Sequence, residues 1–356
     1  MSPRVAFVFP GQGEKRVDVA LRAALRTELG RELCEMASEA SGAPLRLLET
    51  RPDLLDPQMV YQAMMTALSL SAAEALSRAG VRPSVVMGHS LGELAAWAAG
   101  GAFSPRKAIR LAALRGRLMG REAGSNPGGM VALSTGDGAA IKAALAEGGS
   151  RGRLCVAAYN APDEVVLSGD EPAIRAVLSF APAIATRVPT PGPWHSPAMK
   201  HIVFGMGSHF RLEGPEPLRC DFVLNRTGEV HRCTPESPGL TVPGVVDAAG
   251  DPLDLPEIFA EQLARPVLWS KCVRSLLGLA DIVVMMGPTA VLRSLWHRNV
   301  RAEVASGARS SGDLPVLYST DDERALAATI EALTRSGAAT PPSEVPSAGP
   351  LTGGAP

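Results

Sequence analysis

The segment from Ser84 to Ala99 constrains the fold of this chain more than any other part of the sequence. It begins with a short apolar run, passes through Gly88-His-Ser-Leu-Gly92 and continues into a stretch with helical periodicity. A buried strand, a sharp turn between glycines and a helix, in that order, push the Ser90 hydroxyl out at the carboxyl end of a sheet. The amides at the start of the helix face the same point and can stabilise an oxyanion. We therefore interpret Ser90 as a nucleophile; the alternative is an ordinary serine in a glycine-rich turn.

Strands and helices alternate over the first part of the chain. Arg4 to Phe9 is a short apolar run that ends at Pro10, which predicts a buried strand followed by a tight turn. Helical periodicity then extends over 17–40 and 56–79, before the strand that leads to Ser90. This alternation predicts an α/β fold with a parallel sheet covered by helices.

The pattern changes near residue 128. Short elements follow in the order strand, helix, strand, strand, helix, strand, at 130–133, 139–147, 154–159, 164–167, 172–180 and 183–188. This order is typical of a small ferredoxin-like unit. We therefore predict a discontinuous large α/β domain at 1–127 and 194–320, with an inserted subdomain at 128–193. A C-terminal helix is expected at 321–335, and the Pro-, Gly-, Ser- and Ala-rich segment 336–356 is expected to be a disordered tail.

Composition excludes several classes of function. Lys and Arg total 35 and Asp and Glu total 36, a net charge of -1, so no overall positive field attracts nucleic acid or an anionic membrane. No signal-peptide pattern or membrane-length apolar run is present. The five cysteines are an odd number without a CxxC pair, which argues against a disulfide framework or a structural zinc site. We expect a soluble, cytoplasmic, monomeric protein.

A serine nucleophile needs a base, and the residues alone do not choose it. The six histidines are His89, His195, His201, His209, His231 and His297. His89 adjoins Ser90, so its side chain is expected to point away from the hydroxyl. The order of a general α/β hydrolase favours His297, with Asp281 or Asp254 as its partner.

Several collinear segments together resemble the malonyl-CoA:acyl carrier protein acyltransferase family, which includes the acyltransferases of polyketide synthases. The matching segments are Phe7-Val-Phe-Pro-Gly-Gln-Gly13, Gly88-His-Ser-Leu-Gly-Glu93, Leu114-Arg-Gly116, Gly129-Met-Val131, Tyr159-Asn160, His195-Ser-Pro197, Asn225 with Thr227-Gly228, Gln262 with Pro266-Val267, and Gly287-Pro288. They span most of the chain. The resemblance implies a hydrolase-like large domain with an inserted ferredoxin-like subdomain, the organisation expected from the residues.

The resemblance assigns the catalytic residues. Ser90 becomes the acyl-accepting nucleophile and His195 its general base and later acid, in a cleft between the two subdomains. The backbone amides of Gln12 and Leu91 would form the oxyanion hole. The main-chain carbonyl of Gln262 would orient His195, in place of the Asp of a triad.

The resemblance also assigns a substrate site. Arg115 matches an arginine that grips the free carboxylate of a malonyl group, for which a guanidinium offers two parallel donors; its spacing alone favours a solvated helix residue. Asn160 would support the site through a hydrogen bond. His89 and Trp194 complete the expected substrate-binding residues. Trp194 precedes the base where polyketide members usually carry Phe for malonyl or Ser for methylmalonyl, so its ring favours malonyl, and an unusual extender unit stays open.

The implied reaction transfers a malonyl-type acyl group from CoA to the phosphopantetheine thiol of an acyl carrier protein. No metal or redox cofactor is needed, because CoA is part of the substrate and phosphopantetheine belongs to the partner. We expect neither a nucleic acid nor a membrane as partner, and a free-standing enzyme acting in trans.

Two rival functions are an acyl hydrolase that clears carrier proteins and a non-catalytic acyl-binding or docking module. Arg115 argues against the hydrolase, and intact Ser90, His195 and Gln12 argue against the docking module. The chain departs from the family's pattern at Glu14 in the segment after Gly13, at Arg265 and at Met285.

Overall fold

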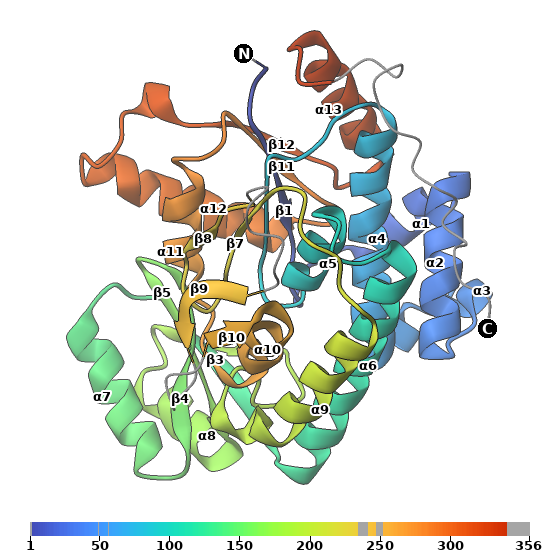
Figure 1. Cartoon of the computed structure of the whole chain (residues 1–356). Coiled ribbons are helices and arrows are strands. Elements are labelled where there is room, and N and C mark those ends of the chain that lie inside the picture. Colours follow the sequence, from blue (N-terminus) through green and yellow to red (C-terminus); the bar gives the residue numbers. More distant parts are fainter. Residues whose placement is uncertain (1, 49, 56, 234–240, 247–251, 340–356) are drawn as a thin grey trace.

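A computed structural model describes residues 2–48, 50–55, 57–233, 241–246 and 252–339. Its largest sheet has six strands in the order β12-β11-β1-β2-β7-β8. The strands are β1 (Val5–Phe9), β2 (Val85–Gly88), β7 (Asp221–Val223), β8 (Val230–His231), β11 (Ile282–Met285) and β12 (Val316–Ser319). All neighbours are parallel except β7 and β8. Because β1 and β2 lie side by side, the segments after Phe9 and Gly88 leave the sheet at the same edge (Figure 1).

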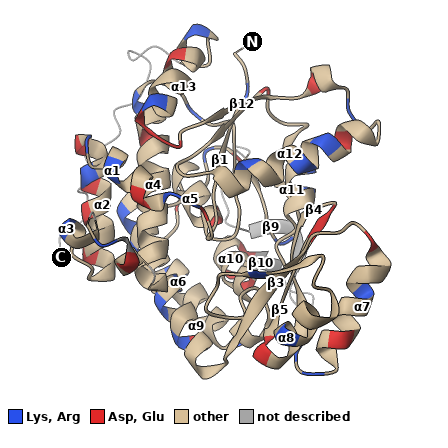
Figure 2. Cartoon of the chain, turned by 180° about the vertical axis from the view of Figure 1, so that it is seen from behind, with Lys and Arg blue, Asp and Glu red and all other residues tan. Residues whose placement is uncertain are grey.

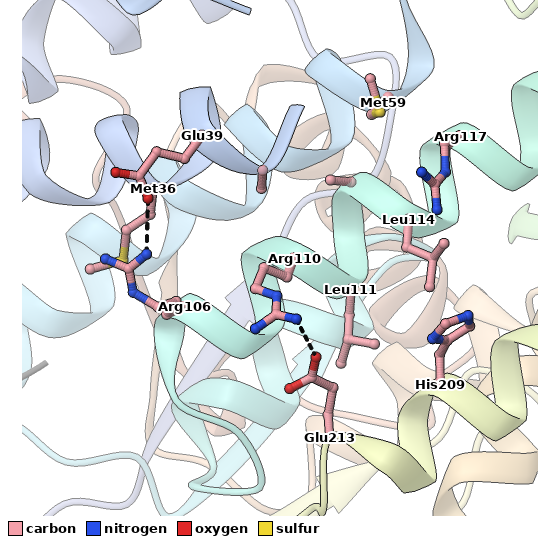
Figure 3. Close-up of a pocket in the computed structure, with 12 residues that line it drawn as sticks. Met36, Glu39, Met59, Arg106, Arg110, Leu111, Leu114, Arg117, His209 and Glu213 are labelled. Atoms are coloured by element: carbon pink, nitrogen blue, oxygen red, sulfur yellow. Dashed lines mark hydrogen bonds and ion pairs between the residues drawn. The ribbon is translucent and has the colours of Figure 1, made fainter. Parts of the chain in front are cut away.

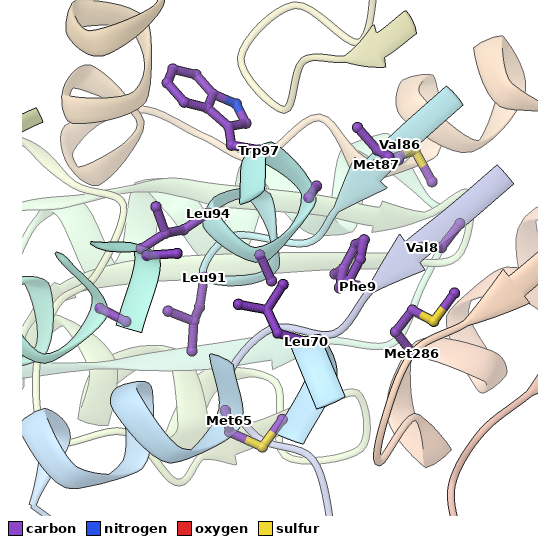
Figure 4. Close-up of a cluster of buried hydrophobic side chains, with 14 of the residues drawn as sticks. Val8, Phe9, Met65, Leu70, Val86, Met87, Leu91, Leu94, Trp97 and Met286 are labelled. Atoms are coloured by element: carbon purple, nitrogen blue, oxygen red, sulfur yellow. The ribbon is translucent and has the colours of Figure 1, made fainter. Parts of the chain in front are cut away.

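Helices pack around this sheet. They are α1 (Val17–Ala24), α2 (Glu28–Ser41), α3 (Leu45–Leu48), α4 (Gln58–Arg78), α5 (Gly92–Ala99), α6 (Pro105–Ser125), α9 (Lys200–Leu212), α10 (Leu255–Glu261), α11 (Trp269–Leu276), α12 (Ala290–Ala305) and α13 (Glu323–Arg335). Helix α4 is buried on nearly all sides, as its apolar and small residues require. Figure 4 shows side chains of β1, β2, α4 and α5 meeting in one cluster around Phe9 and Leu91.

The inserted segment forms a second, four-stranded sheet. Its strands are β3 (Gly128–Leu133), β4 (Leu154–Ala161), β5 (Glu164–Asp170) and β6 (Ala185–Val188), and its helices are α7 (Gly138–Gly149) and α8 (Glu171–Phe180). The order β4-β5-β3-β6 is antiparallel throughout. This small subdomain has its own hydrophobic core, and it lies below α11 and α12 in Figure 1. The predicted α/β class, with a parallel sheet and a small ferredoxin-like insertion, is confirmed.

A backbone seam joins the small sheet to the large domain. The Tyr159 amide donates to the Val267 carbonyl at 2.9 Å, and the Val267 amide donates to the Ala157 carbonyl at 2.9 Å. This parallel bridge extends the edge of β4 with a segment that follows α10. The next residue, Leu268, donates from its amide to the Asn225 carbonyl at 2.9 Å. The two subdomains therefore share main-chain hydrogen bonds beside the cleft.

Two expectations differ from the structure. The helix expected over 17–40 is two helices, because the Thr27 side chain accepts a hydrogen bond from the Gly30 amide at 3.0 Å and caps a new helix. The expected tail begins later than residue 336. Ala339 bridges to Val81 and packs on the core, and the rest of that tail, 340–356, lies outside the described residues.

Charges of both signs are interspersed along the outer helices, including α1, α2 and α13 (Figure 2), in keeping with the net charge of -1. Among the helices that the structure describes, none combines the length and the apolar character needed to span a membrane. The small two-stranded sheet of β9 (Thr241–Val246) and β10 (Pro252–Asp254) completes the fold.

Candidate active site

Ser90 lies on a strained turn between β2 and α5, with a backbone φ of 50°. The glycines around it are required by close backbone contacts. A Cβ on Gly88 would lie 2.0 Å from the Gly92 carbonyl carbon, and a Cβ on Gly92 would lie 2.3 Å from the Phe9 carbonyl oxygen. Side chains at either position would force the turn apart. Glycine is therefore needed two residues before and two residues after Ser90. The turn places Ser90 in the lining of a cavity.

His195 is the histidine that reaches this hydroxyl. Its Nε2 lies 2.7 Å from Ser90 Oγ, and its Nδ1 lies 2.8 Å from the Gln262 carbonyl oxygen. A carbonyl can only accept, so Nδ1 carries the proton and Nε2 is free to accept from the serine. Burial and the positive charge of Arg115 lower the pKa of His195 to about 3. The imidazole is therefore neutral at physiological pH and can act as a base.

Arg115 is not the solvated helix residue that its spacing alone suggested. It projects from α6, is 1% exposed and donates from Nη2 to Ser90 Oγ at 3.2 Å. Further donations reach the side-chain oxygens of Gln62 at 2.9 Å and Gln262 at 3.3 Å. Burial lowers its pKa to about 10, opposed by the charge of Glu93. The guanidinium thus stays charged beside the nucleophile, and its Nε is without a hydrogen-bond partner among the described residues.

Glu93 organises the floor of the site, a role that the sequence did not reveal. Its carboxylate accepts from the Asn225 amide at 2.8 Å and from the Gln262 side chain. Asn225 in turn accepts from the Ser90 amide at 2.8 Å and donates to the Gly88 carbonyl at 2.5 Å. Burial raises the pKa of Glu93 to about 8. The sequence feature that could have pointed to this role of Glu93 is its charge, because the rest of the helix that follows Ser90 is apolar.

Two amides near the nucleophile are available to bind an oxyanion. Among the hydrogen bonds between described residues, none is donated by the amide of Gln12 or Leu91. Gln12 lines the same cavity as Ser90 and His195, whereas Leu91 begins the turn into α5. The Ser90 amide is already used by Asn225. Free donors beside a serine can stabilise charge that develops on an attacked carbonyl.

The cavity has a volume of about 320 Å³ and is lined by both subdomains. Strand alternation explains its apolar wall. Met130 and Ala132 of β3 face the cavity, whereas Val131 and Leu133 between and beyond them pack into the small core. In β5, Val166 likewise lines the cavity while its two neighbours face that core. The small sheet thus presents one face to the cavity and the other to α7 and α8.

The remaining expected residues also line this cavity. Trp194 is 3% exposed, and its ring lies so close to Gly192 that a Cβ there would be 2.6 Å from two ring atoms. His89 places Nε2 3.0 Å from Asn160 Oδ1 and packs edge-on against Trp269. Asn160 also donates to Glu164 at 3.0 Å. The His89 side chain therefore hydrogen-bonds to Asn160 and not to the hydroxyl of the adjacent Ser90.

The alternative base His297 does not line the cavity. It is exposed on α12, and its two candidate partners are engaged elsewhere. Asp281 accepts from the backbone and side chain of Arg4, and Asp254 caps α10. The order of an ordinary hydrolase triad is therefore not realised.

A second cavity, of about 390 Å³, lies between α2, α6 and α9 (Figure 3). Its arginines are largely engaged with carboxylates on its own rim. Arg106 pairs with Glu39 at 2.9 Å, and Arg110 pairs with Glu213 at 3.4 Å. None of the expected site residues lines it. Although it is slightly larger, it lacks the nucleophile and base.

Comparisons with known proteins identify the family of this chain. A model described as the acyl transferase domain matches residues 6–208. The polyketide synthase GfsB of Streptomyces halstedii is 30% identical over 305 residues, covering 83% of this chain and 5% of the synthase. The malonyl CoA-acyl carrier protein transacylase of Salmonella typhimurium is 27% identical over 307 residues, covering 85% of this chain and 94% of that protein.

Solved structures show the same relationship. The acyl-carrier-protein S-malonyltransferase of Burkholderia pseudomallei superposes with a TM-score of 0.74 at 28% identity, covering 92% of this chain and 99% of that one. This chain spans only a small part of the polyketide synthases that it matches, 13% in the case of the spectinabilin polyketide synthase system protein NorB of Streptomyces orinoci.

Proposed function

Because this chain belongs to the acyl transferase domain family, we propose that it moves a malonyl-type acyl group from CoA to the phosphopantetheine thiol of an acyl carrier protein. The product would serve polyketide or fatty acid synthesis. One observation carries the proposal: a buried, charged guanidinium stands 3.2 Å from the hydroxyl that a histidine can deprotonate.

In the first half-reaction, Ser90 attacks the thioester carbonyl while His195 takes its proton. The Gln12 and Leu91 amides hold the tetrahedral oxyanion, and the Gln262 carbonyl stabilises the imidazolium through Nδ1. The carbon–sulfur bond then breaks, and CoA leaves as the thiol with the proton from His195. A malonyl ester remains on Ser90.

In the second half-reaction, the phosphopantetheine thiol takes the place of CoA. His195 accepts the thiol proton, the sulfur attacks the ester, and Ser90 leaves with the proton returned to its oxygen. Both halves use one base and one oxyanion site, which gives ping-pong kinetics. Exclusion of water from the buried ester favours transfer over hydrolysis.

Arg115 sets the acyl class in this proposal. A buried guanidinium without an anion is unfavourable, and a malonyl carboxylate supplies that anion. The unpartnered Nε and the two glutamine oxygens around Arg115 support this view, because both glutamines can yield to a stronger acceptor. Trp194 narrows the same cavity and favours an unbranched malonyl group. An acyl hydrolase acting on uncharged acyl groups has no use for such a residue.

Neither a metal nor a redox cofactor takes part in this chemistry, since proton transfer and oxyanion binding suffice. The partners we propose are acyl-CoA and the carrier protein, with neither nucleic acid nor membrane involved. We place a monomeric enzyme in the cytoplasm, where the free thiols of Cys34, Cys220 and Cys272 would stay reduced.

Intact-protein mass spectrometry tests the proposal. The protein is mixed with malonyl-, methylmalonyl- and acetyl-CoA in turn, and a phosphopantetheinylated carrier protein is then added. We expect a malonyl adduct on Ser90 that moves to the carrier, and no adduct on Ser90→Ala. An adduct lost to water at the same rate without carrier would indicate the hydrolase, and no adduct with any ester would indicate a docking module.

A further inference from the structure

Glu14 follows the turn that carries Gln12, and it is buried although it bears a charge. The side chain is 8% exposed, and its two carboxylate oxygens accept from the amides of Val291 and Leu292, each at 2.8 Å. These amides belong to the second and third residues of α12. An ionised carboxylate at a helix N-terminus satisfies donors that the helix itself leaves open and meets its positive end.

Helix α12 takes this cap from a distant part of the chain. Its N-cap residue, Thr289, makes no side-chain cap and instead donates from its hydroxyl to Asp321 at 2.8 Å. Glu14 therefore supplies what Ser, Thr or Asp supplies at most helix starts. A carboxylate from the turn after β1 thus ties that turn to α12.

The turn is fixed on both sides of Gln12. On one side, Gly11 packs so tightly that a Cβ would lie 2.7 Å from the His89 carbonyl oxygen. On the other side, the Gly13 amide donates to the Tyr61 hydroxyl at 3.2 Å, and Glu14 holds α12. Gly13 has a φ of 102°, which a residue with a side chain rarely adopts. The Gln12 amide lies between these two anchors.

Helix α12 is in turn held by the small subdomain. Asn299 donates to the Asn160 carbonyl at 2.8 Å, and Arg298 contacts Glu164 at 2.5 Å. The helix also contributes Leu292 and Leu295 to the cavity. Glu14 therefore links α12, which the small subdomain holds, to the turn that presents the Gln12 amide.

We propose that Glu14 is a positioning residue, whose carboxylate fixes the Gln12 amide in the geometry that an oxyanion on Ser90 requires. The inference rests on the proposed function in one respect, the role of the Gln12 amide. It goes beyond that function by assigning a residue at which this chain departs from the segment that usually follows the Gly13 turn in its family.

The negative charge of Glu14 contributes to its positioning role. The groups that face Glu14 are Asp321 and Arg293, together with Tyr61 from α4. Burial raises the pKa of Glu14 to about 7, and the two helix amides oppose that rise. Above that pH the carboxylate is ionised and both its oxygens accept; below it, protonation weakens the link. Burial and Arg115 lower the pKa of His195, and the comparison of the wild type with Glu14→Gln separates the titration of Glu14 from that of the base.

A fluorophosphonate probe tests the proposal without assuming any acyl group. Ser90 Oγ attacks phosphorus as its proton passes to His195, the phosphorus–oxygen bond forms, and fluoride leaves. The phosphoryl oxygen occupies the oxyanion site, so the rate reports the position of the Gln12 amide. The rate of Ser90 labelling is measured from pH 5.5 to 8.5 for the wild type, Glu14→Gln, Glu14→Asp and the control Asp137→Asn. Asp137 also caps a helix, α7, but on the exposed surface.

In Glu14→Gln one acceptor becomes a donor that faces a helix amide. We expect labelling to slow by about 10- to 100-fold at pH 8, with the decline near pH 7 abolished. Glu14→Asp keeps the charge and is expected to give an intermediate rate with the decline retained, and Asp137→Asn to match the wild type. Circular dichroism gives the folded fraction of each sample.

Three results would overturn the proposal: labelling of Glu14→Gln within twofold of the wild type, a loss fully explained by its unfolded fraction, or an unchanged pH profile. If the wild type is labelled by the probe but not by malonyl-CoA, the proposed function fails while the role of Glu14 stands.

Discussion

The two walls of the active-site cavity are built in opposite ways. The polar wall comes from the large domain, where Ser90 and Arg115 line the cavity. Behind them, Gln262 hydrogen-bonds to both, and Glu93 accepts from Gln262. All four residues are less than a tenth exposed.

The apolar wall comes from the small subdomain, where Met130, Ala132 and Val166 of its antiparallel sheet line the cavity, with the polar Asn160 and Glu164 beside them. Neighbouring residues of that sheet form a separate core.

Because of this difference, the polar wall determines the reactivity of Ser90, and the apolar wall determines the shape of the cavity. A change in the polar wall disturbs several partners together, because each side chain there satisfies another buried group. A change in the apolar wall alters the outline of the cavity and leaves the hydrogen-bond network intact. The predictions below test this separation, in order of decreasing effect.

The largest effect is expected for the base. His195→Ala should slow acylation of Ser90 by about 1,000-fold or more, since the hydroxyl is then attacked without proton removal. Stopped-flow release of CoA measures this rate. His297→Ala, an exposed change on α12, should behave as the wild type. If His297→Ala is the inactive variant, the polar wall is not the reactive one.

Arg115→Ala is expected to affect the turnover of malonyl-CoA and of acetyl-CoA differently. Turnover of malonyl-CoA should fall by about 100-fold or more, as when one partner of a buried charge pair is removed. Turnover of acetyl-CoA should be retained or should rise, because acetyl has no carboxylate. Steady-state kinetics with both esters measure the ratio. Equal losses for both esters would mean that the guanidinium serves only the network around Ser90.

Glu93 should matter for stability and for its pH dependence. Glu93→Ala leaves the Asn225 amide and the Gln262 side chain without an acceptor, so we expect a loss of about 1–3 kcal/mol for each donor in urea unfolding. The folded-state pKa of Glu93, about 8, lies above the ordinary value of 4.5. Its contribution to stability is therefore present below pH 4.5 and is lost as the pH rises through 8.

Glu93→Gln removes this titration. The unfolding free energy of the variant should decline less than that of the wild type between pH 5 and pH 8. Parallel curves for the two proteins would contradict the raised pKa.

The smallest effect is expected where the cavity changes only its outline. Trp194→Ser should raise the methylmalonyl to malonyl ratio of kcat/KM by about tenfold, because one methyl group in a pocket contributes about 1–3 kcal/mol, whereas Trp194→Phe should keep the preference for malonyl. Labelling of Ser90 by the fluorophosphonate should stay within threefold of the wild type. A large loss of labelling would show that shape and reactivity are not separable at this position.

Local spacing was enough to predict Ser90 as the nucleophile, because Gly88 and Gly92 are required by close backbone contacts at the turn that carries it. His195 was different: the order of a general hydrolase favoured His297, and only the collinear motifs selected His195, since the contact joins segments 105 residues apart. Gln62 and Glu93 were missed because their partners come from distant elements. Strands β7 and β12 were missed as well, because they are short and, unlike β2 and β11, include polar residues such as Asp221 and Ser319 in place of a continuous apolar run.

The seam between β4 and Val267 has a consequence for engineering. Val267 is close in sequence to Gln262, which holds one histidine, while β4 carries Asn160, which holds another. Exchanging the inserted subdomain for that of a relative would therefore change the hydrogen bonds that orient these histidines, as well as the lining of the cavity. Chimeras that graft residues 154–161 together with 262–268 should stay active more often than chimeras that cut between them.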